Sequence, residues 1–218
     1  MPTQLKEGTL GILEDVYDAV INGKVEDAAA GVQKGLNEGM HVDEILKKGL
    51  LAAMEIVGER FGEGEIFIPQ VLWSAKAMQA GVALLKPHFA ESSFEKRARI
   101  IIGTAKGDIH DIGKQLVAMM LEGAGFEVID LGVDVAPDVF VETAAEKQAD
   151  IIAVSALLTT TMTSMADVVA LKNERALSSR VLIGGAPLSR EYCREIGADG
   201  YGVDARAAVA RARELIGD

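Results

Sequence analysis

Throughout the last part of the chain, short apolar runs alternate with stretches whose apolar residues recur at helical spacing. An apolar run of this length fits a buried strand better than a helix. The runs predict strands at 100–104, 127–131, 150–155, 180–183 and 200–202, and the segments between them predict helices at 114–122, 137–148, 163–175, 189–196 and 205–216. Alternating strands and helices build a parallel sheet with helices on both faces. We therefore expect an α/β domain with a doubly wound, five-stranded parallel sheet.

The first ninety residues follow a different pattern, with helical periodicity and almost no strand signal. Helices are predicted at 9–22, 25–36, 42–61 and 69–86, separated by short turns rich in glycine. Four helices joined by short turns favour a small bundle. We expect a helical bundle domain at 1–90, a polar linker at 91–97 that could act as a hinge, and the α/β domain at 98–218.

Charge and composition exclude several classes of protein. The formal net charge is −11, from 22 basic and 33 acidic residues, which argues against a surface that binds nucleic acid. The single cysteine, Cys193, excludes an internal disulfide and suits a reducing compartment. The sequence shows neither an apolar run of membrane-spanning length nor the pattern of a signal peptide. A cytoplasmic protein with no membrane partner is expected.

The loop after the first predicted strand holds the residues with the clearest chemistry, Gly107 to Gly113. His110 should lie at the carboxyl end of that strand, where open α/β sheets bind their ligands. Asp108 lies two residues earlier, close enough to bond one imidazole nitrogen and leave the other for a metal. Gly107 and Gly113 would allow a tight turn and a close approach to a bulky group.

Two further strand ends should meet this loop. In a flavodoxin-like (Rossmann-like) sheet with the order 2-1-3-4-5, the strand order reverses between the first and third strands. The third strand ends in a run of small hydroxyl residues between Ser155 and Thr161, and the fourth ends in Gly184 and Gly185. The hydroxyl groups could hydrogen-bond an embedded ligand or Asp108, and the glycines could admit a flat or elongated group.

These residues together resemble a cobalamin-binding motif. The pattern consists of Asp-x-His-x-x-Gly at Asp108, His110 and Gly113, Ser-x-Leu at Ser155 and Leu157, and Gly-Gly at Gly184 and Gly185. Across nearly its whole length the chain resembles the small corrinoid proteins of methyltransferase systems, and it is similar to the cobalamin-binding module of methionine synthase. The resemblance implies a cofactor that is cobalamin or a related corrinoid, in the methylcobalamin and cob(I)alamin states.

The same resemblance implies roles for individual residues. His110 would be the lower axial ligand of cobalt in place of the cofactor's own base, and Asp108 would orient it. Thr161 stands where the third member of this hydrogen-bond relay is often serine, a change that keeps the hydroxyl. Further cofactor contacts would come from Gly113 and Leu157 of the motif and, around the nucleotide tail, from Ser155, Thr159, Gly184 and Gly185.

The resemblance also covers the helical part. Glu65–Val71, with Ser74 and Ala75, matches the segment that lies over the reactive face of the corrin in that family. Phe67 is therefore expected to contact the corrin, although a place in the bundle core, together with Trp73 and Met78, is the alternative.

The implied activity is that of a methyl carrier. A donor-specific methyltransferase would load the cobalt and an acceptor methyltransferase would unload it to a pterin or a thiol, with a reductive activator protein as a further partner. Because the chain is too short to include a catalytic barrel, it should be a non-catalytic subunit of such a system.

Three alternatives stay open at the sequence level. A cobalamin-dependent sensor or regulator would need an output module, and none is evident in these 218 residues. A phosphate-receiver domain would need an aspartate where the third strand ends, and that position is Ser155. A subunit of an adenosylcobalamin mutase is disfavoured because such modules normally lack the helical bundle.

Overall fold

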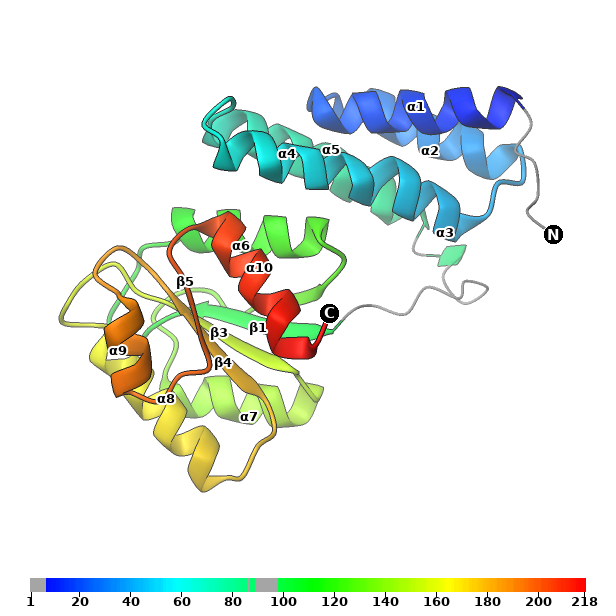
Figure 1. Cartoon of the computed structure of the whole chain (residues 1–218). Coiled ribbons are helices and arrows are strands. Elements are labelled where there is room, and N and C mark those ends of the chain that lie inside the picture. The colour runs from blue at the N-terminus through cyan, green and yellow to red at the C-terminus, as the bar shows by residue number, and fades with distance from the viewer. Residues whose placement is uncertain (1–6, 86, 89–97) are drawn as a thin grey trace. The chain divides into compact units, whose positions relative to one another are not determined.

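The structure is a computed structural model that describes residues 7–85, 87–88 and 98–218 (Figure 1). The chain divides into two compact units, residues 1–95 and residues 96–218. The predicted linker and hinge at 91–97 lie outside the described residues, as does Lys86 at the predicted end of the fourth helix. Among the described helices, none is both long enough and apolar enough to cross a membrane.

The first unit is helical, as predicted. Its elements are α1 (Glu7–Ile21), α2 (Val25–Asn37), α3 (Val42–Glu44), η1 (Ile45–Leu51), α4 (Ala52–Gly62) and α5 (Ile68–Leu85). Helix α2 packs between α1 and α5, and α4 packs against α1 and α5. The core of the bundle consists of fully buried aliphatic side chains such as Val16, Val32 and Leu50.

The predicted third helix, 42–61, is not a uniform α-helix, because its middle part, η1, is a π-helix. Its buried residues repeat every four positions, at 45, 49, 53 and 57 and again at 46, 50, 54 and 58. Each residue of an α-helix is rotated by about 100° around the helix axis relative to the residue before it. Side chains four residues apart therefore differ in direction by about 40°, and a row with this spacing gradually leaves one face of the helix. The wider turn of a π-helix reduces this drift, which keeps both rows of side chains in the core.

The second unit is the predicted α/β domain. Its elements are β1 (Arg99–Thr104), α6 (Ile112–Gly123), β2 (Glu127–Asp130), α7 (Pro137–Lys147), β3 (Ile151–Ser155), α8 (Thr163–Glu174), β4 (Arg180–Gly184), α9 (Arg190–Glu195), β5 (Gly200–Gly202) and α10 (Ala205–Ile216). The strands form one parallel sheet of order β2-β1-β3-β4-β5, which confirms the predicted topology.

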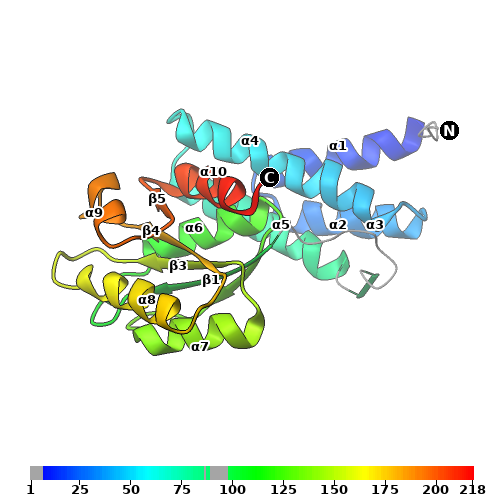
Figure 2. The same ribbon diagram turned by 60° about the horizontal axis from the view of Figure 1, so that its bottom comes forward.

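Helices cover both faces of this sheet, with α6 and α10 on one side and α7 and α8 on the other (Figures 1 and 2). Successive strand residues alternate between the two layers. Ile101 and Ile152 belong to the core that includes side chains of α7 and α8, whereas Ile100 and Ile151 belong to the core with α6 and α10. Because both faces are buried, the strands are continuous apolar runs in the sequence, which is why they could be predicted.

The strand order also fixes where the functional loops meet. The strand order reverses between β1 and β3, since β1 lies between β2 and β3. Thr104 at the end of β1 pairs with Ser155 at the end of β3, and Ser155 pairs with Gly184 at the end of β4. The loops after these three strands therefore leave one edge of the sheet side by side, at the position where such sheets bind ligands.

Candidate functional site

The loop that carries His110 is held by its own backbone. Gly107 has φ of +81°, a left-handed conformation that suits glycine, and this turn brings the Asp108 N–H to the Ala105 carbonyl at 3.0 Å. The Thr104 hydroxyl donates to the His110 carbonyl at 3.0 Å. The end of β1 thus contacts the backbone of the histidine directly, and the position of His110 depends on a buried strand.

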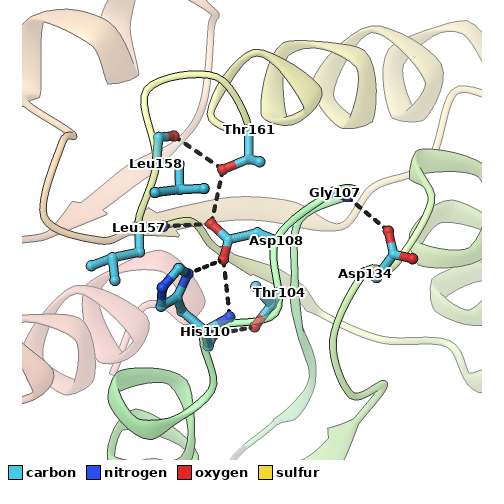
Figure 3. A network of polar contacts seen from close by, with 8 residues as sticks. All are labelled: Thr104, Gly107, Asp108, His110, Asp134, Leu157, Leu158 and Thr161. Atoms are coloured by element: carbon cyan, nitrogen blue, oxygen red, sulfur yellow. Dashed lines mark hydrogen bonds and ion pairs between the residues drawn. The ribbon is translucent and has the colours of Figure 1, made fainter.

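Asp108 is the centre of the site (Figure 3). Its side chain is fully buried, and its carboxylate accepts bonds from two loops. One oxygen accepts the His110 backbone N–H at 3.0 Å and contacts the His110 ring nitrogen Nδ1 at 2.6 Å. The other accepts the Leu157 N–H at 2.7 Å and the Thr161 hydroxyl at 2.8 Å. Asp108 therefore joins the loop after β1 to the loop after β3, and the predicted contacts of Asp108 with His110 and Thr161 are both present.

These hydrogen bonds determine the charge of Asp108. Burial by itself would raise the pKa of this carboxyl, but the backbone N–H groups of His110 and Leu157, the His110 ring and the Thr161 hydroxyl hold that pKa well below its usual range. Asp108 is therefore a carboxylate, which can only accept hydrogen bonds. Nδ1 of His110 must then carry the hydrogen, and in a neutral imidazole the lone pair is left on Nε2.

The surroundings of His110 are exposed and apolar. Its side chain is 48% exposed although Nδ1 is bonded to the buried Asp108. Large apolar side chains that are also exposed occur in the same two loops, at Ile109, Leu157 and Leu158, and at Ile112, the first residue of α6. An imidazole among exposed aliphatic side chains would suit a metal held in a broad apolar ring.

The end of β4 provides a close approach of two backbones. Gly185 has φ of +139°, and a Cβ atom at this residue would lie 1.8 Å from the Ala156 carbonyl oxygen. Only glycine fits there, so the loops after β3 and β4 stay in contact. Gly113 behaves differently from the prediction, because it lies within α6 without a positive φ and does not make a turn. A Cβ atom at Gly113 would meet nothing within 4 Å, so the backbone there is open.

The other predicted residues lie as follows. Ser155 is the last residue of β3, and Thr159 is an exposed residue of the loop between β3 and α8. Phe67 belongs to the first unit and is 66% exposed, so its placement in the bundle core is wrong. Trp73, at 54% exposed, is also outside the core, whereas Met78 is buried as predicted.

Three polar residues that support the loop were not predicted from the sequence. Lys114 is buried and pairs with Asp130 at the end of β2, and Asp134 accepts the Gly107 N–H at 2.8 Å. Helical periodicity did not reveal Lys114 because it considers apolar positions only. An available signal was the strand order itself, which places the end of β2 beside the end of β1.

The donor set fits a corrinoid better than a bare metal ion. Within the described residues, no group of three or more His, Cys, Asp or Glu side chains could hold a metal. A corrin ring brings its own nitrogen ligands to its metal, so the protein would need to supply only a further ligand. His110, oriented by a buried carboxylate and set in an apolar surface, fits that requirement.

Comparisons with known proteins agree with this chemistry. B12 binding domain families match residues 98–210 and residues 12–86. The dimethylamine corrinoid protein 3 of Methanosarcina acetivorans is 45% identical over 94% of this chain and 97% of its own length. A corrinoid protein of Desulfitobacterium hafniense is 40% identical over 95% of this chain and 99% of its own length.

Solved structures show the same relationship. A cobalamin-binding protein of Desulfitobacterium hafniense has a TM-score of 0.76 at 32% identity, over 94% of this chain and 98% of that one. The methanol:cobalamin methyltransferase complex of Methanosarcina barkeri contains a chain with a TM-score of 0.87 at 26% identity, over 94% of this chain and 80% of that one. This chain belongs to the family of B12-binding corrinoid proteins.

Proposed function

We propose that this protein carries a methyl group on a protein-bound corrinoid between two methyltransferases. The observation that carries the proposal is the pairing of His110 with the buried Asp108, which leaves Nε2 as a ligand in an exposed apolar surface. When bound, the corrinoid supplies a cobalt centre that can accept a methyl group and give it up again. The names of the relatives, which are corrinoid proteins of methylamine systems, support the same function.

The role of the protein side chains follows from their contacts. His110 would hold the metal of the corrinoid through Nε2 and would be kept in one tautomer by Asp108, which the Leu157 N–H and the Thr161 hydroxyl fix in turn. The contact between the Asp108 carboxylate and Nδ1 would keep Nε2 directed away from Asp108, so that one hydrogen-bonded group would fix the orientation of the ligating nitrogen. Gly113, Leu157 and Phe67, together with Ser155, Thr159, Gly184 and Gly185, are proposed as further cofactor contacts.

A methyltransferase is the partner that the relatives support, because one solved relative is a methanol:cobalamin methyltransferase complex. The relatives named for dimethylamine and trimethylamine make a methylamine the first donor to test. We further propose an acceptor methyltransferase that uses a pterin or a thiol, a reductive activator protein, and a location in the cytoplasm. In this scheme the chain is a carrier subunit without its own donor site.

The first test is reconstitution. The apoprotein is titrated with hydroxocobalamin, and the visible spectra of wild type, His110→Ala and the control His88→Ala are compared. His88 is an exposed histidine outside the site. Stoichiometric uptake, with an axial-ligand band shift that is absent from His110→Ala and present in His88→Ala, is expected. No uptake by the wild type, or a band shift that does not depend on His110, would contradict cofactor binding at this site.

The second test is methyl transfer. Reconstituted protein is reduced without oxygen and mixed with a dimethylamine methyltransferase and dimethylamine. Conversion of the spectrum to the methylated form, dependent on both enzyme and amine, is expected. A sensor would bind the cofactor but would not be methylated by any donor-specific methyltransferase tried with mono-, di- or trimethylamine or methanol. That result would favour the regulatory alternative.

A further inference from the structure

Residues 130–134, which begin with the last residue of β2 and lead toward α7, lie beside the loop that carries His110. Backbone pairing continues beyond the two strands: the Thr104 N–H donates to the Gly132 carbonyl at 3.0 Å, and the Val135 N–H donates to the Thr104 carbonyl at 2.9 Å. Ala105 and Val135 form an isolated parallel bridge. The two loops therefore run side by side at the sheet edge. A side-chain contact between them can restrain the loop that carries His110.

One such contact lies after His110 in the sequence. The ammonium group of Lys114 in α6 is 2.5 Å from an Asp130 oxygen and 3.2 Å from the Gly132 carbonyl. It is also 2.8 Å from Asp111, which follows His110 directly and precedes α6. The Lys114 side chain is 1% exposed. A buried ammonium needs such partners, and here they tie the residue next to His110 to the end of β2.

A second contact lies before His110 (Figure 3). The Asp134 carboxylate accepts the Gly107 N–H at 2.8 Å, and the Asp134 N–H donates to the Asp108 carbonyl at 2.9 Å. Lys106 is 3.2 Å from the same carboxylate. Asp134 has φ of +54°, in the left-handed region, which aspartate adopts more readily than most residues with a side chain.

Building on the proposed corrinoid-carrying function, we propose that Lys114 and Asp134 are positioning residues for His110. Together they fix the loop at both ends against residues 130–134, so that the imidazole is held where it meets the metal. Neither residue touches the ring or the cofactor in this scheme. The side chains of Lys106 and Asp134 are 57% and 49% exposed, so general stability is a weak reason for that pair.

The experiment measures histidine ligation separately from cofactor uptake. The full chain is reconstituted with cobalamin and reduced to the cobalt(II) state, where an axial nitrogen splits the electron paramagnetic resonance lines. The fraction of split signal gives the ratio of histidine-on to histidine-off forms, and equilibrium dialysis gives cobalamin affinity. The variants are Lys114→Met, Asp130→Asn and Asp134→Gly, the last of which keeps the positive φ accessible.

Two surface variants are the controls. Lys147→Met removes an exposed lysine that pairs with its neighbour Glu146, and Asp138→Asn removes an exposed carboxylate from the first turn of α7. The controls should leave the ratio unchanged. Partners that orient a ligating histidine typically change metal affinity by roughly 10–100-fold, and these residues act through one more contact, so each variant should lower the ratio by about 3–10-fold.

Equal ratios in wild type, Lys114→Met and Asp134→Gly would overturn the inference, even if the variants were less stable. If Lys114→Met does not fold, the more exposed Asp130 and Asp134 decide the matter: a lowered ratio in Asp130→Asn and Asp134→Gly supports the inference, and unchanged ratios overturn it. If the wild type takes up no cobalamin, the proposed function itself is contradicted. This outcome is distinct from unchanged ratios, which contradict only the positioning role of Lys114 and Asp134.

Discussion

At the scale of single residues, the site depends on one buried carboxylate. Asp108 would be costly to bury as an anion without partners, and it is stable there because four donors reach it. Two of those donors come from the loop after β3, so the orientation of His110 depends on both loops. A change at Thr161 should therefore affect His110 without touching it.

Thr161→Val tests this dependence, because valine keeps the shape of threonine and removes the hydroxyl that donates to Asp108 at 2.8 Å. Loss of a hydrogen bond to a buried charge should lower the free energy of unfolding of the apoprotein by about 1.5–3 kcal/mol. Thr161→Ser keeps the donor and should cost clearly less. Urea unfolding of the three proteins checks the order. A Thr161→Ser variant as unstable as Thr161→Val would show that the methyl group, and not the hydroxyl, matters.

Residue-level prediction from sequence succeeded where partners are close in the sequence or follow a motif. The contact of Asp108 with His110 follows from their spacing of two residues, and Thr161 follows from the end of a predicted strand. It failed for Lys114 and Asp134, whose partners are 16 and 27 residues away. Their contacts depend on the register of two loops, which no local pattern encodes.

At the scale of elements, the closeness of the loops after β3 and β4 depends on a glycine. The strand ends pair in register at Ser155 and Gly184, and the next residue, Gly185, contacts the Ala156 backbone. Backbone cannot move aside as a flexible side chain can. The sequence indicated glycines at this edge, and the structure gives the reason for one of them.

Gly185→Ala should therefore be severely destabilising. Its Cβ would lie 1.8 Å from a carbonyl oxygen at a φ that alanine rarely adopts, so the loop must shift at a cost of roughly 3 kcal/mol or more. Gly217→Ala is the matched control, since its φ is +79° with nothing within 4 Å, and only the backbone strain of about 1–2 kcal/mol is expected. Thermal unfolding compares them. Equal losses in both variants would contradict a steric role for Gly185.

Helix α9 shields the only cysteine of the chain. Cys193 is 6% exposed. Burial raises the pKa of its thiol, and the negative charge of the nearby Asp199 raises it further. A raised pKa leaves less thiolate at a given pH, and the thiolate is the reactive form.

Alkylation by iodoacetamide at pH 8 should be at least about tenfold slower in the native protein than in urea. The native rate should keep rising with pH beyond the point where the unfolded thiol, with a pKa of about 8.5, levels off. Mass spectrometry measures the single adduct. Equal rates in both states would show that α9 opens readily.

At the scale of the whole molecule, the two units have different sequence patterns, and each pattern predicted its fold class. Strands buried on both faces appear as apolar runs, and bundle helices appear as amphipathic stretches. The π-helix η1 and the exposure of Trp73 were not predicted, and the exposure of Phe67 was predicted only as one of two alternatives. A pattern of apolar residues indicates which side chains avoid water, but it does not identify apolar side chains kept at a surface for a ligand or partner.

The family matches extend over both units, at residues 12–86 and 98–210. Within the second unit, we propose that one protein nitrogen, on His110, ligates the cobalt. Nitrogen-14 splits a cobalt(II) resonance line into three and nitrogen-15 splits it into two, so isotope labelling identifies the ligand directly.

The decisive measurement uses protein labelled with nitrogen-15 histidine and reconstituted with unlabelled cobalamin. The account predicts two-line splitting in the wild type and in the His88→Ala control, and loss of that splitting in His110→Ala. Three-line splitting in the labelled wild type would mean that the cofactor's own base still ligates the metal. That result would contradict the role of His110 on which the account depends.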